Sequence, residues 1–170
     1  MNTKRQEGFS LIELLIVVAI IGIIAAIAIP NLLASKRAAN EGSAQSSIRT
    51  IHSAESVFKA TVGNGDYGPL HIATPAASGE ASLAGQNLVD SVLGSGTKSG
   101  YTITATADNT GNPTLFFAAA HPANVAAVTR TGNRAFCITE AGVLKGLVSD
   151  VDPTDHDDCA DNAAWPALGN

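Results

Sequence analysis

Six aspartates near the C-terminus form the densest group of possible metal ligands in this sequence. They lie within twelve residues and surround His156: Asp150, Asp152, Asp155, Asp157, Asp158 and Asp161. Carboxylate oxygens suit calcium, yet this spacing lacks the glycine and the terminal glutamate of an EF-hand loop. A solvated acidic loop and a calcium site both fit the pattern. The candidate calcium ligands are Asp150, Asp152, Asp155, Asp157 and Asp158.

His52 and Glu55 form a second candidate pair, because a spacing of three residues places them on one face of a helix. Such a pair could hold a metal ion, but it also fits a solvated pair at the edge of an apolar stripe. The four histidines form no HExxH motif, and the sequence contains no glycine-rich phosphate loop and no GxSxG motif. We therefore expect no enzymatic activity and no cofactor.

The overall charge gives little support to nucleic-acid binding. The 170 residues include 10 basic and 15 acidic side chains, for a formal net charge of −5. The basic residues are scattered and do not alternate with aromatic residues, so we expect no direct contact with nucleic acid. This length accommodates one long helix and a single small domain.

Glu13 is the only ionisable side chain in the apolar run from Phe9 to Ile29, which has twenty-one residues. As a helix this run spans roughly 30 Å, the thickness of the hydrocarbon core of a bilayer. A carboxylate at the centre of such a helix costs about 2.5 to 3.5 kcal/mol on insertion scales, so Glu13 requires a partner or a purpose. Lys4 and Arg5 precede the run, as expected of a cytoplasmic N-terminus.

The sequence GFSLIELL, followed by an apolar helix containing Gly22 and Pro30, resembles the N-terminus of type IV prepilins and type II secretion pseudopilins. The resemblance covers Met1 to about Ala60. It implies that residues 1–8 are a leader peptide, which prepilin peptidase removes by cutting between Gly8 and Phe9. It also implies N-methylation of Phe9. Glu13 would become the fifth residue of the mature chain. There, the resemblance implies, it neutralises the terminal amine of a neighbouring subunit.

The helix is expected to continue after the apolar segment of residues 9–30, as an amphipathic half over residues 31–62. Apolar residues recur there at steps of three and four: Ala44, Ile48, Ile51, Ala54 and Phe58. Most charged side chains, Glu55 among them, fall on other faces, which predicts one buried stripe. Pro30 lacks an amide hydrogen and should kink or loosen the helix between its two halves.

Residues 63–170 are expected to form the globular head. Gly63-Asn64-Gly65 is a helix stop, and residues 63–100 form a connecting αβ-loop with a short helix from about Leu83 to Leu93. Alternating and β-branched residues over 101–148 predict an antiparallel sheet of about four strands. The strands are expected at Tyr101, around Leu115, over Ala135–Thr139 and over Val143–Val148. A long helix packed on this sheet gives an α+β architecture, the pilin fold.

Cys137 and Cys159 are the only two cysteines, and both lie in the part expected outside the cytoplasm. A disulfide closing a loop over residues 137–159 is the simplest interpretation, with two separate buried thiols as the alternative. Such a bridge would contribute roughly 3 kcal/mol on a chain-entropy estimate. The resemblance favours the disulfide, because many type IV pilins hold a C-terminal loop to the last strand in this way.

The resemblance implies a structural subunit of a type IV pilus, used in adhesion, motility or uptake. The expected partners are other copies of the chain in a helical homopolymer, prepilin peptidase, the assembly machinery of the inner membrane, and the bilayer around residues 9–29. The chain would first span the inner membrane once and then enter an extracellular fibre. Two alternatives are a major pseudopilin of a type II secretion system, which could bind calcium, and a membrane-tethered binding domain that does not polymerise.

Overall fold

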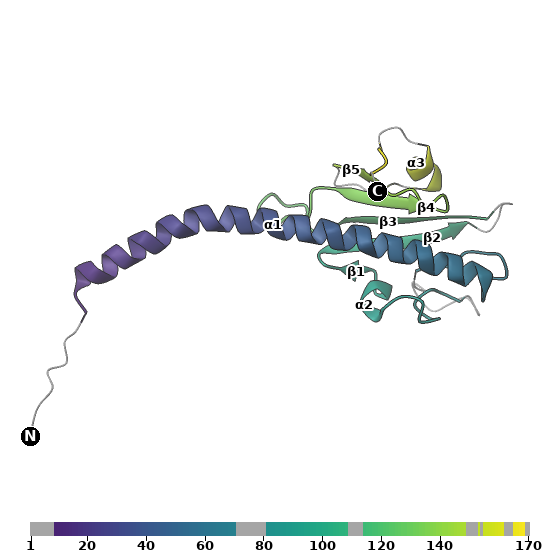
Figure 1. The fold of residues 1–170 in the computed structure, drawn as a ribbon, viewed down its shortest axis with the longest axis horizontal. Coiled ribbons are helices and arrows are strands. Elements are labelled where there is room, and N and C mark those ends of the chain that lie inside the picture. Colours follow the sequence, from purple (N-terminus) through teal and green to yellow (C-terminus); the bar gives the residue numbers. More distant parts are fainter. Residues whose placement is uncertain are drawn as a thin grey trace, which may run out of the picture. The chain divides into compact units, whose positions relative to one another are not determined.

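The structure is a computed structural model that describes residues 9–70, 81–108, 114–148, 153, 155–161 and 165–168. It is built from one long helix and a five-stranded sheet (Figure 1). The elements in chain order are α1 (Leu11–Ala60), α2 (Ser91–Gly94), β1 (Thr97–Lys98), β2 (Tyr101–Asp108), β3 (Leu115–Pro122), β4 (Ala135–Thr139), β5 (Lys145–Leu147) and α3 (His156–Ala160). The chain divides into two compact units, Met1–Lys36 and Arg37–Asn170.

The second half of α1 forms the central rod of the unit Arg37–Asn170. Its predicted apolar stripe is fully confirmed, because all five of its residues are buried in the core: Ala44, Ile48, Ile51, Ala54 and Phe58. The helix ends at Ala60, where Asn64 and Gly65 adopt positive φ angles of 51° and 104°. The amide of Gly63 donates to the carbonyl of Phe58 at 2.8 Å, which satisfies one of the last helical carbonyls.

The sheet is antiparallel throughout, and its strands follow one another in the order β1-β2-β3-β4-β5. Tyr101 lies opposite Pro122, and Ala118 lies opposite Ile138. Both edge strands are short, with two residues in β1 and three in β5. On the outer side of β5, the amide of Gly146 donates to the carbonyl of Pro166 at 3.1 Å.

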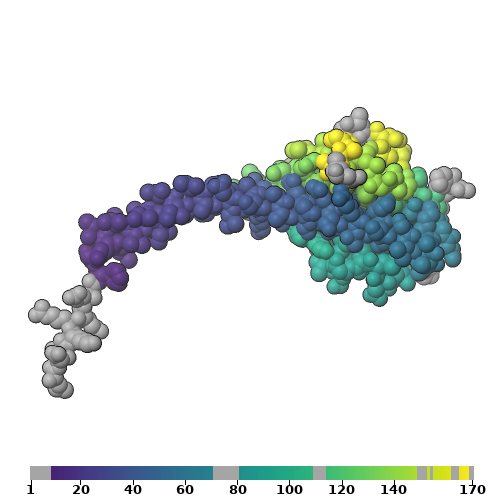
Figure 2. Space-filling model, in the orientation of Figure 1, coloured from purple at the N-terminus to yellow at the C-terminus, as the bar shows by residue number. Residues whose placement is uncertain are grey.

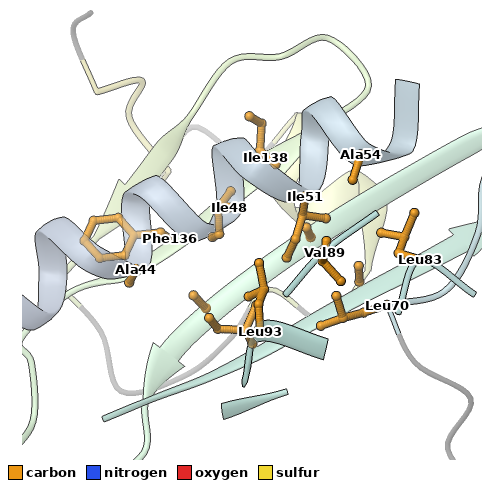
Figure 3. Close-up of a cluster of buried hydrophobic side chains, with 14 of the residues drawn as sticks. Ala44, Ile48, Ile51, Ala54, Leu70, Leu83, Val89, Leu93, Phe136 and Ile138 are labelled. Atoms are coloured by element: carbon orange, nitrogen blue, oxygen red, sulfur yellow. The ribbon is translucent and has the colours of Figure 1, made fainter. Parts of the chain in front are cut away.

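The two faces of the sheet are covered by different parts of the chain. The face towards α1 carries Phe116, Phe136 and Ile138, and together with the αβ-loop it encloses the main core (Figure 3). The opposite face carries Cys137, which packs in a smaller buried cluster with Ala119 of β3, Ala135 of β4, and Cys159 and Trp165 of the C-terminal segment. All five residues of β4 are buried because this strand is covered on both sides.

The α+β architecture predicted from the sequence is confirmed, but three details of the prediction were wrong. The helix expected over Leu83–Leu93 is reduced to α2, because Asn87 has a positive φ of 55° and Asp90 caps a new helix start. The sheet has a fifth strand, β1, which is too short to show alternation. Glu55, placed on the polar side of α1 by the sequence pattern, is fully buried.

The buried stripe of α1 should carry much of the stability of the head. Ile51 is 0 % exposed, so Ile51→Ala should lower the free energy of unfolding by about 2 to 5 kcal/mol through lost burial and a cavity. Val57, on the same helix, is 47 % exposed, and Val57→Ala should change it by only about 0.5 kcal/mol. Urea unfolding of the full chain in detergent micelles measures both, and equal losses would contradict the packing described.

Candidate functional site

The first half of α1 is a bare apolar helix. Its large apolar side chains are exposed on every side, from Phe9, at 91 % exposure, to Leu32, at 69 %. This stretch of α1 is drawn in purple in Figure 2, and by length and composition it can cross a membrane. An apolar surface of this size is not stable in water, because burying apolar area is the main favourable term in folding and association. This half of α1 therefore needs lipid or other protein around it.

Glu13 lies in the first turn of α1. Its Oε2 accepts a hydrogen bond from the backbone amide of Ser10 at 2.9 Å. This is the reciprocal half of a capping box, which satisfies an amide that the helix itself leaves without a partner. A carboxylate in the first turn also interacts favourably with the positive end of the helix dipole. The carboxylate is thus placed at the end of the helix where a cleaved chain would carry its amine.

Pro30 lies inside α1, which continues through it. Proline has no amide hydrogen, so the carbonyl of Ala26 receives no helical hydrogen bond from this position. One residue later, the side-chain amide of Asn31 donates to the carbonyl of Ile27 at 3.1 Å. The kink or loosening expected at Pro30 stays a prediction.

The predicted disulfide between Cys137 and Cys159 is confirmed. It joins β4 to α3, on the face of the sheet that points away from α1. The described C-terminal residues 155–161 and 165–168 cover this face, and we call them the lid. The backbone amide of Leu168 donates to the carbonyl of Leu144 at 2.9 Å, and the side chain of Lys145 donates to the carbonyl of Ala160. The lid is therefore held by covalent and polar links together.

A charged contact also holds the lid. Nε2 of His156 lies 3.0 Å from both carboxylate oxygens of Glu140, in the turn between β4 and β5, and its Nδ1 lies 3.1 Å from Asp157. Partial burial opposes the charge on His156, but hydrogen bonds to Asp157 and Glu140 and the charges of these carboxylates outweigh it. They raise the pKa of His156 above its ordinary value.

Two of the candidate calcium ligands, Asp155 and Asp157, make other contacts. The side chain of Asp155 caps α3 by accepting from the amide of Asp158 at 2.8 Å, and Asp157 contacts His156. Asp150 and Asp152 lie outside the described residues. Within the described ranges, no group of three or more His, Cys, Asp or Glu side chains is arranged to hold a metal ion. A calcium site therefore stays a prediction.

His52 and Glu55, the second candidate pair, make contacts in different directions. The ring of His52 packs against Phe116, with 5.9 Å between ring centroids, and its Nε2 lies 3.4 Å from the carbonyl of Glu140. Glu55 accepts a hydrogen bond from the backbone amide of Gly68 at 3.0 Å through Oε2. The two side chains are therefore held by different parts of the head.

Glu55 is the residue of this region that the sequence pattern misplaced. Its side chain is 0 % exposed, and its Oε1 has no hydrogen-bond partner among the described residues. Burial raises the pKa of Glu55 to about 7, and the hydrogen bond from Gly68 only partly opposes this rise. Glu55 thus ties the αβ-loop to α1 at the cost of a carboxyl group that prefers to be neutral.

A bare apolar N-terminal helix, joined to a head in which the same helix packs on an antiparallel sheet, defines a pilin-like protein. A family profile described as the prokaryotic N-terminal methylation motif matches residues 3–29. The N-terminal part of the chain is thus similar to that of type IV pilins and type II secretion pseudopilins. No solved structure matches it.

Curated relatives of both kinds share its N-terminal third. The type IV major pilin protein PilA of Myxococcus xanthus is 46 % identical over 54 residues, which cover 32 % of this chain and 24 % of the relative. The type IV wide pilus major component PilA4 of Thermus thermophilus is 60 % identical over 38 residues, covering 22 % and 29 %. The type II secretion system core protein G of Aeromonas hydrophila is 37 % identical over 59 residues, covering 35 % and 41 %. The chain thus spans between about a quarter and two fifths of these relatives' lengths.

Glu55 should make the stability of the head fall with rising pH. Its pKa is raised from 4.5 to about 7 in the folded state, so the unfolded chain loses this proton first and stability is lost between these two values. The loss should reach about 3 kcal/mol above pH 7. Glu55→Gln keeps the acceptor for Gly68 and removes the charge, so the variant should be more stable than the parent at pH 8 and similar at pH 4. Glu41→Gln, on the same helix, is the matched control in urea unfolding, and a pH-independent effect of Glu55→Gln would contradict this assignment.

The stabilisation that the contact between His156 and Glu140 gives to the lid should be lost as pH rises. Because the pKa of His156 is raised, its stabilisation is complete below the ordinary value of about 6.5 and is lost as pH rises through the higher folded value. Hydrogen exchange of the amides in α3 should therefore accelerate from pH 6 to pH 8 beyond the intrinsic rate. His156→Gln should abolish this extra acceleration, and an unchanged pH profile in that variant would contradict the contact.

Proposed function

We propose that this chain is the structural subunit of a type IV pilus, made as a prepilin in the inner membrane. Prepilin peptidase cuts between Gly8 and Phe9, methylates the Phe9 amine, and leaves a chain that polymerises through the first half of α1. The observation that carries the proposal is a bare apolar helix whose single carboxylate, Glu13, lies in its first turn. The match of the methylation motif to residues 3–29 supports the same processing.

Packing, and not new hydrophobic burial, has to hold the helices in such a fibre. The apolar side chains are dry both in lipid and in a helix bundle, so moving between them yields little hydrophobic free energy. Close approach of backbones is then the available gain, and the first half of α1 contains small residues that permit it: Ala19, Gly22, Ala25, Ala26 and Ala28. A Cβ added at Gly22 would meet nothing within 4 Å in the single chain, so the space beside it is free for a neighbour.

Glu13 supplies the charge that makes this packing specific. Cleavage at Gly8 creates a cationic amine four residues before it. A buried amine with no counter-ion is strongly destabilising, whereas a buried pair costs less than either charge alone. The carboxylate accepts the Ser10 amide through Oε2, and a carboxylate has acceptor capacity beyond this one bond for the amine of a neighbouring subunit. A subunit that leaves the membrane and joins the fibre is thus favoured when it carries both charges.

A major pseudopilin of a type II secretion system is the second candidate, because core protein G of several such systems matches the same N-terminal region. The acidic residues of the lid would favour this candidate if they bound calcium. The third hypothesis is a membrane tether that does not polymerise. It differs from the other two because Glu13 would have no role in assembly.

Replacement of Glu13 tests polymerisation directly. Glu13→Gln preserves shape and removes the charge, so the yield of sheared filaments should fall at least about tenfold, since an unpaired buried charge costs about 3 to 5 kcal/mol. Membrane insertion of the variant should be equal or better, because a neutral side chain is cheaper in lipid. Electron microscopy and quantification of the sheared fraction measure the yield, with mass spectrometry of the N-terminal peptide to detect methylated Phe9.

The matched control is Glu41→Gln, which removes the same charge from the head and should leave filament yield near that of the parent. Normal yield from Glu13→Gln would favour the tether. An N-terminal peptide that still begins at Met1 in assembled filaments would overturn the processing step.

A further inference from the structure

Residues 67–68 of the αβ-loop lie against the end of α1 and cover Phe58, the last buried side chain of this helix. A Cβ added at Gly68 would come within 2.8 Å of ring carbons of Phe58, so the backbone of this glycine packs directly on the ring. The ring of Tyr67 packs on Phe116, with 4.7 Å between the ring centroids. This short segment therefore closes one end of the main core, where Phe58 is only 3 % exposed.

The segment is tied to α1 by one buried side chain. The backbone amide of Gly68 donates to Oε2 of Glu55 at 3.0 Å. The next residue is bound to another part of the loop, because the carbonyl of Pro69 accepts from the amide of Leu83 at 3.0 Å. Loss of the bond to Glu55 can therefore free residues 67–68 while the chain beyond them stays in place.

Glu55 makes this tie with a group that does not ionise easily where it lies. Its side chain is 0 % exposed, and among the described residues Oε1 has no hydrogen-bond partner. When the carboxyl group is protonated, Oε2 can still accept from Gly68 while Oε1 carries the hydrogen. When the proton is lost, a charge is left in the core with a single donor, which is far more costly than a neutral group.

Charged neighbours do not remove this cost. The pKa of Glu55 is raised to about 7 by burial, and only the Gly68 amide opposes the rise. Lys59, one turn later on α1, directs its Nζ to Thr114 at 3.0 Å and over the ring of Tyr67. Other titratable groups on the elements around this core are His52 of α1, Asp66 and Tyr67 of the αβ-loop, Asp90 before α2, Asp108 of β2, His121 of β3 and Glu140 after β4.

We propose that Glu55 is a proton-controlled latch: when its carboxyl group loses its proton, residues 67–68 move away from α1 and water reaches the carboxylate. The ring of Phe58 is uncovered in the same movement. Opening two residues exposes much less apolar surface than unfolding the head, so it is the less costly way to hydrate the charge. The head thus hides this ring in acidic surroundings and exposes it in alkaline ones. The latch lies within the head and does not depend on the polymerisation proposed above.

Hydrogen exchange at the amide of Gly68 tests the latch in the full chain in detergent micelles. With a pKa of 4.5 for the open carboxyl group and about 7 for the closed one, the protection factor at Gly68 should fall by about 70-fold from pH 5 to pH 8. The amide of Leu83 is the internal reference and should be better protected at pH 8. Low concentrations of urea should leave exchange at Gly68 unchanged, because local opening exposes little surface.

Two glutamine variants separate the latch from a general effect of pH. Glu55→Gln keeps an acceptor for Gly68 and cannot ionise, so its protection factor at Gly68 should be the same at pH 5 and pH 8. Glu41→Gln is the matched control, because Glu41 also accepts a backbone amide, that of Asn133 at 2.8 Å, but is only half-buried. This variant should keep the full fall at Gly68.

Two results would overturn the latch. One is a fall of the protection factor at Gly68 that persists in Glu55→Gln. The other is seen in the parent chain alone: equal protection factors and equal urea dependence at Gly68 and Leu83 would mean that the whole loop or the whole head opens. The second result needs no variant, so the proposal stays testable even if Glu55→Gln does not fold.

Discussion

One helix has to satisfy two different surroundings, and the rest of the structure depends on this constraint. The first half of α1 exposes apolar side chains on all sides, whereas the second half buries a single stripe against the sheet. No break in the helix separates the two patterns. An amphipathic stripe fixes the head to the helix at definite residues, because moving the register by one residue would carry the stripe away from the core. The apolar half has no such stripe, and its one charged side chain, Glu13, lies in its first turn.

The head is stabilised from both faces of its sheet. The side towards α1 is an ordinary apolar core, in which the αβ-loop fills the remaining edge. The lid side is thinner and relies on the disulfide, on Lys145 and on the pair formed by Glu140 and His156. Glu55 is a polar exception in the larger core. Buried carboxyl groups of this kind lower stability unless they are protonated or fully hydrogen-bonded, so Glu55 makes the attachment of the αβ-loop sensitive to proton concentration.

Most of the fold could be predicted from the sequence because its signals are local and periodic. Residue spacing predicts the apolar run, the stripe from Ala44 to Phe58 and strand β4. The disulfide was predicted because both cysteines are expected outside the cytoplasm and because the family resemblance favours it. The burial of Glu55 could not be predicted, because it depends on where the αβ-loop returns to the helix. The ends of α2 and the two-residue strand β1 depend on turns with too few residues to show a period. The attachment of the loop 123–134 by Arg37 and Asn40 joins residues about ninety positions apart, which no local pattern reveals.

The short edges of the sheet restrict how copies of this chain can join. β1 offers two residues, and the outer side of β5 is already occupied by the chain near Ala167. Neither edge provides a long row of free backbone groups on which the strand of another molecule could be added. Amyloid-like stacking of heads is thereby disfavoured, even at the high local concentration of the proposed fibre. The polymer proposed above would then grow through helix contacts, which are side-chain interactions and can be broken again.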